Sequence, residues 1–155
     1  MSTVENQKTF ELAARRGSDN TALRATVYAY YKAVNDGRWE DVTNFFHEDG
    51  VLLVPSQEPK VGHDVILKFY SAHGRYFPEH HDDVPVLMVD GNRVMTLIEF
   101  HGVDREGERI NYWNAGVFTI EDGRFRQYRV IFDTAELPAW LRRRNARWND
   151  GSEAG

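Results

Sequence analysis

The fold class follows from residues 81–133, which read HDDVPVLMVDGNRVMTLIEFHGVDREGERINYWNAGVFTIEDGRFRQYRVIFD. Polar and apolar residues alternate along most of this stretch, and a period of two is typical of half-buried strands. The alternation is interrupted by three turn signals, Asp90-Gly91-Asn92, Arg105-Glu106-Gly107 and Glu121-Asp122-Gly123. We therefore predict a meander of four antiparallel strands over residues 81–89, 94–101, 109–120 and 124–133.

The residues before this stretch have a helical period instead. A strong helix is predicted from an N-cap at Ser18 or Asp19 to the stop signal Asn35-Asp36-Gly37. Its apolar face carries Leu23, Val27, Tyr30, Tyr31 and Val34. Shorter elements are then expected in the order helix 39–46, turn Glu48-Asp49-Gly50, strand 51–54 and helix 63–72.

Three helices followed by an antiparallel meander predict an α+β fold. The helices must cover one face of a curved, mainly antiparallel sheet, because only there can their apolar faces be buried. The expected architecture is a cone-shaped α+β barrel. The space between its helices and its sheet would form a concave, mostly apolar cavity of the kind that binds small molecules.

The chain has 155 residues, which predicts one folded domain. We predict a flexible N-terminal arm over residues 1–18, the barrel domain over 19–136 and a C-terminal tail over 137–155. The tail contains the apolar run Leu137-Pro138-Ala139-Trp140-Leu141, so it is expected to act as a lid over the cavity or as a dimer contact.

The composition argues against several kinds of protein. Without cysteine the chain has no disulfide, thiolate zinc site or cysteine nucleophile, and a net charge of -5 argues against general nucleic-acid binding. No long apolar run and no secretory signal occur, so a cytoplasmic protein that does not contact membranes is expected. No phosphate-binding glycine loop or nucleophile elbow occurs, so no cofactor is expected. The neighbours His80 and His81 should point to opposite faces of a strand, so no metal site is expected either.

Four motifs resemble one known superfamily over roughly residues 20–135. They are Ala33-Val34-Asn35-Asp36-Gly37-Arg38-Trp39, Phe45-Phe46-His47-Glu48-Asp49-Gly50-Val51, Gly116-Val117-Phe118-Thr119-Ile120-Glu121-Asp122-Gly123-Arg124 and Phe132-Asp133-Thr134. They are similar to the nuclear-transport-factor-two-like superfamily, especially its SnoaL-like polyketide cyclase and ketosteroid isomerase group. The resemblance implies a cavity for a small molecule and a homodimer formed through the outer face of the sheet. Since the superfamily also includes dehydratases, epoxide hydrolases and non-enzymatic dimerisation modules, the motifs predict the fold better than the reaction.

The resemblance also assigns positions for chemistry. Tyr30 matches the oxyanion-hole tyrosine of steroid isomerases, but their general-base aspartate falls on Val54 and their protonated aspartate on Gly116. The dehydratases of the superfamily have a histidine that matches His80 and a strand asparagine that matches Asn114. A steroid isomerase of the usual mechanism is therefore not expected. The dehydratase match covers His80 and Asn114 but not the second histidine of those enzymes.

The epoxide hydrolases of the superfamily have an Arg-x-Asp pair that falls on Glu99 and His101, and a last-strand aspartate that falls on Val130. Glu99 and His101 share a strand face with Met95 and Leu97, and the resemblance makes this the cavity face. A carboxylate that orients an imidazole forms a general acid–base pair. The alternative is a solvated histidine at the strand end, with Glu99 paired to an arginine.

The predicted catalytic residues are His101, Glu99, Tyr30, Asn114 and His80. His101 would move the proton, Tyr30 and Asn114 would hold the oxygen that becomes negative, and His80 would be a second acid or base. Only one of the neighbours Tyr30 and Tyr31 is expected to point fully inward. The predicted substrate-binding residues are Val54, Tyr112, Gly116, Phe118, Tyr128, Val130, Phe132 and Trp140. The alternative for their aromatic members is that they only fill the core.

The sequence thus predicts a cofactor-independent lyase or isomerase of the cyclase or dehydratase type. It would use acid–base catalysis on a hydrophobic, oxygenated substrate such as a polyketide, a terpenoid or a phenolic. A non-catalytic ligand-binding or dimerisation module of the same fold is the first alternative, and an epoxide hydrolase with a rearranged site is the second.

Overall fold

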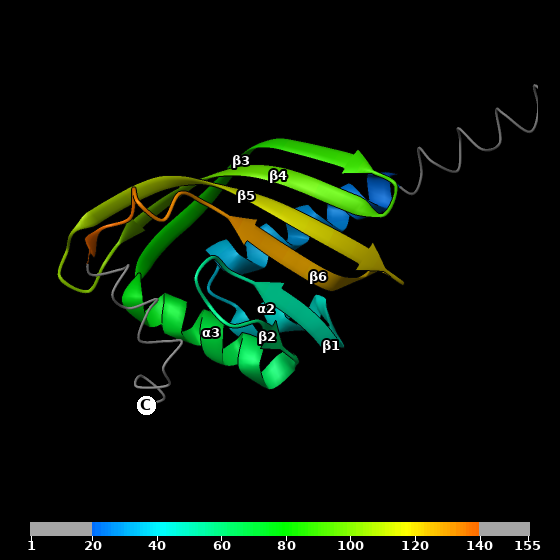
Figure 1. Ribbon diagram of the computed structural model, residues 1–155, viewed down its shortest axis with the longest axis horizontal. Helices are drawn as coiled ribbons and strands as arrows, with labels where there is room; N and C mark the ends of the chain where they lie inside the picture. The colour runs from blue at the N-terminus through cyan, green and yellow to red at the C-terminus, as the bar shows by residue number, and fades with distance from the viewer. Residues whose placement is uncertain (1–19, 140–155) are drawn as a thin grey trace, which may run out of the picture.

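The structure is a computed structural model that describes residues 20–139 (Figure 1). The predicted arm over residues 1–18 and most of the predicted tail, including Trp140, lie outside the described residues. No helix within residues 20–139 is long and apolar enough to cross a membrane.

Six strands form one curved sheet in the order β2-β1-β6-β5-β4-β3. Their bounds are β1 Phe46–Leu53, β2 Lys60–Val61, β3 Glu79–Asp90, β4 Arg93–Val103, β5 Arg109–Glu121 and β6 Arg124–Ile131. The last four strands are the predicted antiparallel meander, whereas β1 pairs parallel with β6. The α+β class and the mainly antiparallel sheet are confirmed, but the described strands do not close into a barrel, because β2 and β3 remain edge strands.

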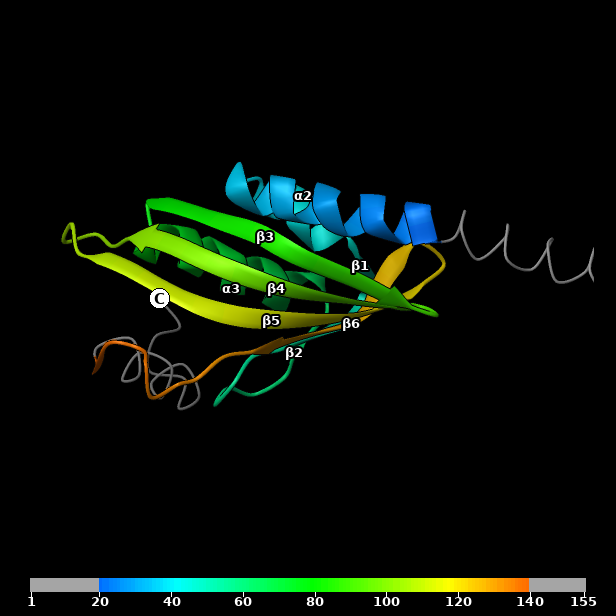
Figure 2. The same cartoon turned by 90° about the horizontal axis from the view of Figure 1, so that it is seen from above.

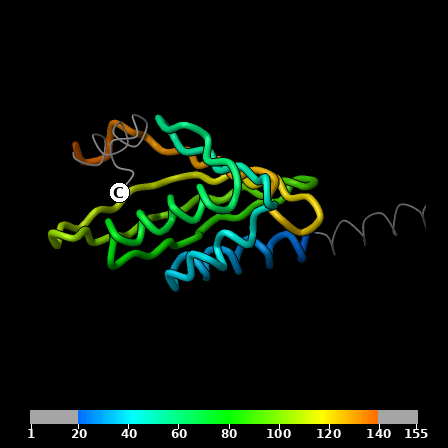
Figure 3. Tube along the Cα trace, turned by 90° about the horizontal axis from the view of Figure 1, so that it is seen from below, coloured from blue at the N-terminus to red at the C-terminus, as the bar shows by residue number. Residues whose placement is uncertain are grey.

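Helices pack on the inner face of this sheet. They are a first helix that covers residues 20–35, α2 Trp39–Asn44 and α3 His63–Tyr76. Figures 2 and 3 show the first helix and α3 against the curved sheet. Fully buried residues from both helices, such as Val27 and Ile66, share one core with Ile98 and Phe118 of the sheet. The apolar faces of the helices therefore determine which face of the sheet is covered.

The predicted turn Glu48-Asp49-Gly50 is wrong, because these residues lie inside β1. The pairing of β1 with β6 shifts between Phe46 and Val51, so the segment forms a bulge instead of a turn. A Cβ atom at Gly50 would lie 2.9 Å from the carbonyl oxygens of both His47 and Phe125. Glycine is needed here because the two backbones approach closely.

The edge strand β3 is held against the end of the first helix by Asn35. The Asp82 N–H donates a hydrogen bond of 2.8 Å to Asn35 Oδ1, and Asn35 Nδ2 donates one of 3.1 Å to the Asp82 carbonyl. Backbone groups of an edge strand otherwise remain open to other chains. The helix-ending asparagine therefore also covers the sheet edge and fixes the position of Asp82.

We expect Asn35→Ala to lower the free energy of unfolding by about 1–3 kcal/mol, because two partly buried peptide groups lose their partner. Urea unfolding followed by circular dichroism measures this change. Asn44→Ala, at the exposed end of α2, is the matched control and should have a much smaller effect. Equal destabilisation by the two variants would contradict the role given to Asn35.

Candidate functional site

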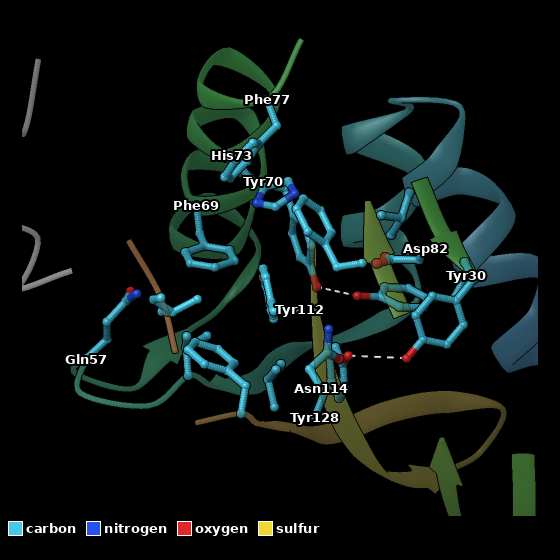
Figure 4. Close-up of a pocket in the computed structure, with 17 residues that line it drawn as sticks. Tyr30, Gln57, Phe69, Tyr70, His73, Phe77, Asp82, Tyr112, Asn114 and Tyr128 are labelled. Atoms are coloured by element: carbon cyan, nitrogen blue, oxygen red, sulfur yellow. Dashed lines mark hydrogen bonds between the residues drawn. The ribbon is translucent and has the colours of Figure 1, made fainter. Parts of the chain in front are cut away.

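A cavity of about 90 Å³ lies between the inner face of the sheet, the first helix and α3 (Figure 4). One part of its wall consists of the four buried side chains Tyr30, Tyr31, Tyr70 and Tyr128. Its more exposed wall is mainly apolar and includes Val54, Phe69, Val130 and Phe132. The cavity is therefore polar at its inner end and apolar toward its other end.

The tyrosines form two hydrogen-bonded groups. The hydroxyls of Tyr30 and Tyr70 bond to each other, and the Tyr31 hydroxyl lies 2.9 Å from Thr96 Oγ1 and 3.3 Å from the Tyr128 hydroxyl. Burial raises the pKa values of Tyr30, Tyr31 and Tyr70 well above the usual value for tyrosine. All three therefore remain protonated at neutral pH and can donate hydrogen bonds.

The expectation that only one of Tyr30 and Tyr31 points inward is wrong. Both are buried and both line the cavity, with their rings edge to face at a centroid distance of 5.0 Å. Neighbours on a helix differ in direction by about 100°, and an apolar face of that width accommodates both. The first helix thus contributes two hydroxyls to the cavity.

Asp82 extends into the cavity from β3, and Figure 4 shows it with Tyr30 and Tyr70, which come from the two helices. Burial raises the pKa of its carboxyl group to about 6, although the charges of His80 and His81 oppose the shift. The hydrogen bonds to Asn35 involve only the peptide group of Asp82, so the carboxylate is available to a ligand. The carboxylate also adds to the raised pKa of Tyr70, after the larger effects of burial and of Tyr128.

Three further polar side chains border the cavity, namely Asn114 of β5, His73 of α3 and Gln57 of the loop between β1 and β2. Asn114 is 9% exposed. Among the described residues, Gln57 Oε1 is buried without a hydrogen-bond partner. Because buried acceptors are normally bonded, this oxygen is suited to a donor on a bound ligand.

Many of the predicted site residues do lie on the cavity wall. They are Tyr30 and Asn114 from the catalytic set, and Val54, Tyr112, Tyr128, Val130 and Phe132 from the substrate-binding set. Their location is established, but their roles in binding and catalysis remain predictions. Leu137, at the start of the predicted tail, is buried against Phe77 and Phe100 and also lines the cavity.

The prediction that Glu99 and His101 face the cavity is wrong. The inner face of β4 carries Val94, Thr96, Ile98 and Phe100, which are all buried, so Glu99 and His101 lie on the outer face. If the match to a family is displaced by one residue along a strand, every side chain of that strand is assigned to the opposite face of the sheet. The alternate residues from Val94 to Phe100 include no ionisable group. This pattern was the signal in the sequence for the inner face of β4.

The predicted role of His80 as an acid or base at the cavity is also wrong. Its Nε2 lies 2.8 Å from the carbonyl oxygen of Val34 and its Nδ1 lies 3.1 Å from that of Phe77. Both ring nitrogens therefore contact the backbone, and His80 is not part of the cavity wall. The ring holds β3 to the ends of the first helix and α3.

Two predicted substrate contacts lie behind the wall. A Cβ atom at Gly116 would lie 2.7 Å from Thr96 Oγ1 and 2.8 Å from Tyr128 Cε2, so Gly116 makes room for these side chains and not for a ligand. Phe118 is fully buried and stacks on the Tyr128 ring at a centroid distance of 4.0 Å. Both residues support the position of Tyr128, which does line the cavity.

Sequence reasoning missed Asp82, Tyr70, His73 and Gln57 as site residues. The signal for Asp82 was its position in β3, two residues after His80 and therefore on the same inner face. The signal for Tyr70 was its position on the apolar face of α3, one helical turn after Ile66. Nothing in the sequence indicated that Gln57 would reach the cavity.

Comparison with protein families gives one match, to the SnoaL-like domain, over residues 27–128. Comparison with the sequences of curated proteins gives no match.

Several solved structures resemble the chain in fold. A putative polyketide cyclase from Xanthomonas campestris pv. campestris has a TM-score of 0.70 and 21% identity, over 75% of this chain and 93% of that one. SalBIII, an epoxide hydrolase/cyclase-like enzyme of pyran ring formation in the polyether salinomycin, has a TM-score of 0.69 and 18% identity, over 76% and 95%. TerC, co-crystallised with polyporic acid, has a TM-score of 0.68 and 19% identity, over 74% and 93%. At these identities the likeness shows the fold alone.

The raised pKa of Asp82 predicts a pH-dependent change in stability. The folded state favours the protonated Asp82 carboxyl group. The contribution of Asp82 to the free energy of unfolding is therefore fully present below its unfolded pKa of about 4, and it is lost as the pH rises through about 6. A shift from 3.8 to about 6 corresponds to about 3 kcal/mol. We therefore expect Asp82→Asn to raise the free energy of unfolding by up to about 3 kcal/mol above pH 7 and to change it little below about pH 4.

Urea unfolding of both proteins across this pH range measures the difference. Asp90→Asn, which removes an exposed carboxylate from the end of the same strand, controls for the change in net charge. A stabilisation by Asp82→Asn that is equal at both ends of the range would contradict the raised pKa.

Proposed function

Because the chain belongs to the SnoaL-like domain family, we propose that it is a cofactor-independent lyase or isomerase of the cyclase or dehydratase type. It acts by general acid–base catalysis on a hydrophobic, oxygenated small molecule such as a polyketide, a terpenoid or a phenolic. The observation that carries this proposal is the Asp82 carboxyl, which lines the cavity with a pKa of about 6 beside protonated tyrosines.

Asp82 takes the role of general base in this proposal. A carboxylate whose pKa is raised to about 6 remains ionised at neutral pH and binds a proton more tightly than an ordinary aspartate. It therefore removes a proton from the carbon next to a substrate carbonyl. The protonated acid then returns the proton to another carbon in an isomerisation, or to a departing hydroxyl in a dehydration.

Tyr30 and Tyr70 take the role of oxyanion donors. Two hydroxyls that bond to each other use one of their two protons, so the second proton remains for a hydrogen bond to the ligand. A carbonyl oxygen that becomes negative at the inner end of the cavity would accept this bond, and the Asn114 amide is a second donor on the same wall. Donors fixed before the reaction need little rearrangement in the transition state.

The size of the cavity limits what can enter. Its volume of about 90 Å³ is smaller than the roughly 150 Å³ that accommodates benzene in an engineered protein cavity. A polyketide-sized substrate would therefore place its reacting carbonyl end among the tyrosines and leave its apolar part against Val54, Val130 and Phe132. The polyporic acid of TerC and the pyran ring formation by SalBIII support an oxygenated cyclic substrate.

A non-catalytic ligand-binding module is the second candidate. It is favoured by the apolar residues Val54 and Val130 at the two wall positions where the resemblance expects acids. Such a module would bind the same class of ligand and release it unchanged. An epoxide hydrolase with a rearranged site is the third candidate, with Asp82 activating a water molecule.

We also propose that two copies of the chain form a dimer through the outer face of the sheet. Large apolar side chains are exposed on this face of β3 to β6, namely Val86, Met88, Met95, Leu97, Trp113 and Ile131. A contiguous apolar patch of this kind commonly marks an interaction surface. A second copy would cover the patch with an identical apolar surface.

We expect the wild-type protein to exchange α-protons of hydrophobic cyclic ketones in D₂O, or to dehydrate their β-hydroxy derivatives, as measured by mass spectrometry. Asp82→Asn should lower the rate by about 100- to 10,000-fold, and Tyr70→Phe by about 100- to 1,000-fold. Asp83→Asn and His101→Ala, on the outer face, should retain the wild-type rate.

The same assay separates the candidates. Ligands that bind but never gain deuterium or lose water would identify a binding module. Incorporation of oxygen-18 from water into a diol product from an epoxide would identify a hydrolase. Full activity of Asp82→Asn would contradict the role of its carboxylate in any of these reactions.

Sedimentation equilibrium tests the dimer. We expect a mass of twice the 18.0 kDa of one chain, and a shift to the monomer in Trp113→Glu, because a charge in the patch opposes its burial. Val61→Glu is the control, since Val61 is 53% exposed but lies on β2, outside the patch. A wild-type monomer at high concentration would rule the dimer out.

A further inference from the structure

A mixed cluster of histidine and carboxylate side chains lies on the outer face of the sheet, opposite to the cavity. It consists of His81 and Asp83 of β3 and Glu99 and His101 of β4. The register pairs His81 with His101 and Asp83 with Glu99, so the four residues form two adjacent cross-strand pairs. Paired residues on one face of a sheet have Cβ atoms only about 4.5–5.5 Å apart, so all four side chains can meet.

The distances within this cluster fit a small cation. His101 Nε2 lies 3.2 Å from Asp83 Oδ2 and 3.7 Å from Glu99 Oε2, and His81 Nε2 lies 3.0 Å from Asp83 Oδ1. Possible ligand atoms of Asp83, Glu99 and His101 all lie within 4.8 Å of one another. Zinc binds nitrogen and oxygen ligands at about 2.0–2.2 Å in a tetrahedron, which separates neighbouring ligand atoms by about 3.3–3.6 Å. These three residues would need only small side-chain adjustments, whereas His81, which contacts the other oxygen of Asp83, would need to rotate.

The orientation of His101 also suits a metal ligand. Its Nδ1 lies 3.1 Å from Asn111 Oδ1, an acceptor, so this contact favours the tautomer with the proton on Nδ1. In the neutral ring the lone pair of Nε2 then points toward the carboxylates of Asp83 and Glu99. Metal-bound histidines almost always donate their other N–H to an oxygen in this way.

The local charge requires a positive partner. Among residues 20–139, no lysine or arginine forms an ion pair with Asp83 or Glu99. Two carboxylates so close together repel each other unless a proton on a histidine or a metal ion lies between them. The side chains are 38–57% exposed, so an ion can reach them directly from solvent.

The geometry points to a zinc site formed by Asp83, Glu99 and His101, with His81 as the fourth ligand after a rotation of its side chain. Two imidazoles and two carboxylates are ligands that suit Zn²⁺. His80 and His81 do point to opposite faces of β3, as the sequence indicates. The two histidines of the proposed site are therefore not these neighbours but His81 and His101 of the adjacent strand β4. The site lies on the face opposite to the cavity and shares no residue with the cavity wall, although the charges of His81 and His101 also act on the Asp82 carboxyl group.

Isothermal titration of the chelator-treated full chain with ZnCl₂ tests this site. We expect one ion per chain, with at least tenfold weaker binding in His101→Ala and in Asp83→Ala. Asn111→Ala should weaken binding by about 10- to 100-fold, because Asn111 orients His101 without touching the ion. His47→Ala, a histidine outside the cluster, is the matched control and should bind like the wild type.

Cobalt provides a second readout. Bound Co²⁺ should give the strong visible absorption of a four-coordinate site in the wild type, and this absorption should be lost in His101→Ala. Circular dichroism of each variant verifies that the fold is retained. Absence of stoichiometric binding, or equal affinity of the wild type and His101→Ala, would overturn the proposal.

Discussion

The two hydrogen bonds between Asn35 and the backbone of Asp82 hold the edge strand β3 to the first helix. The side chains that β3 presents on each face of the sheet depend on this contact. Since side chains alternate along a strand, fixing this one peptide sends Asp82 to the inner face and Asp83 to the outer face. A displacement of β3 by one residue would exchange the two aspartates. The same contact thus determines the acid in the cavity and the acid in the outer cluster.

Inside the cavity, burial raises the pKa of both kinds of acid, with different consequences at neutral pH. It raises the pKa of Asp82 to about 6, where a carboxyl group can accept and return a proton near neutral pH. It raises the pKa of Tyr30 and Tyr70 further from neutrality, so these hydroxyls stay protonated and do not exchange protons at neutral pH. The ionised Asp82 is unfavourable for folding, and such sites commonly reduce stability in favour of function. Packing of the aromatic core, such as Phe118 on Tyr128, stabilises the surrounding wall.

The outer face combines an apolar patch with a charged cluster at one end. Leu97 and Glu99 are consecutive outward residues of β4, so the patch and the cluster meet on this strand. A metal ion there would neutralise the two carboxylates beside the proposed dimer surface. Our proposals therefore assign different functions to the two faces: small-molecule chemistry to the inner face, and binding of an ion and of a second copy to the outer face.

The sequence by itself determined the meander and its three turns, because alternation and turn residues act locally. It also determined the apolar face of the first helix, although only the packed structure showed that both Tyr30 and Tyr31 point inward. Two features depended on the tertiary structure. Glu48-Asp49-Gly50 suits a turn as well as a bulge, and only the pairing of β1 with β6 selects the bulge.

The inner face of β4 could be read from its apolar set, but comparison with relatives pointed to the wrong residues. The site itself could not be read locally, because Tyr30, Tyr70 and Asp82 come from three elements that are distant in sequence. Packing of the two helices on the sheet brings these groups together, and burial then sets their pKa values.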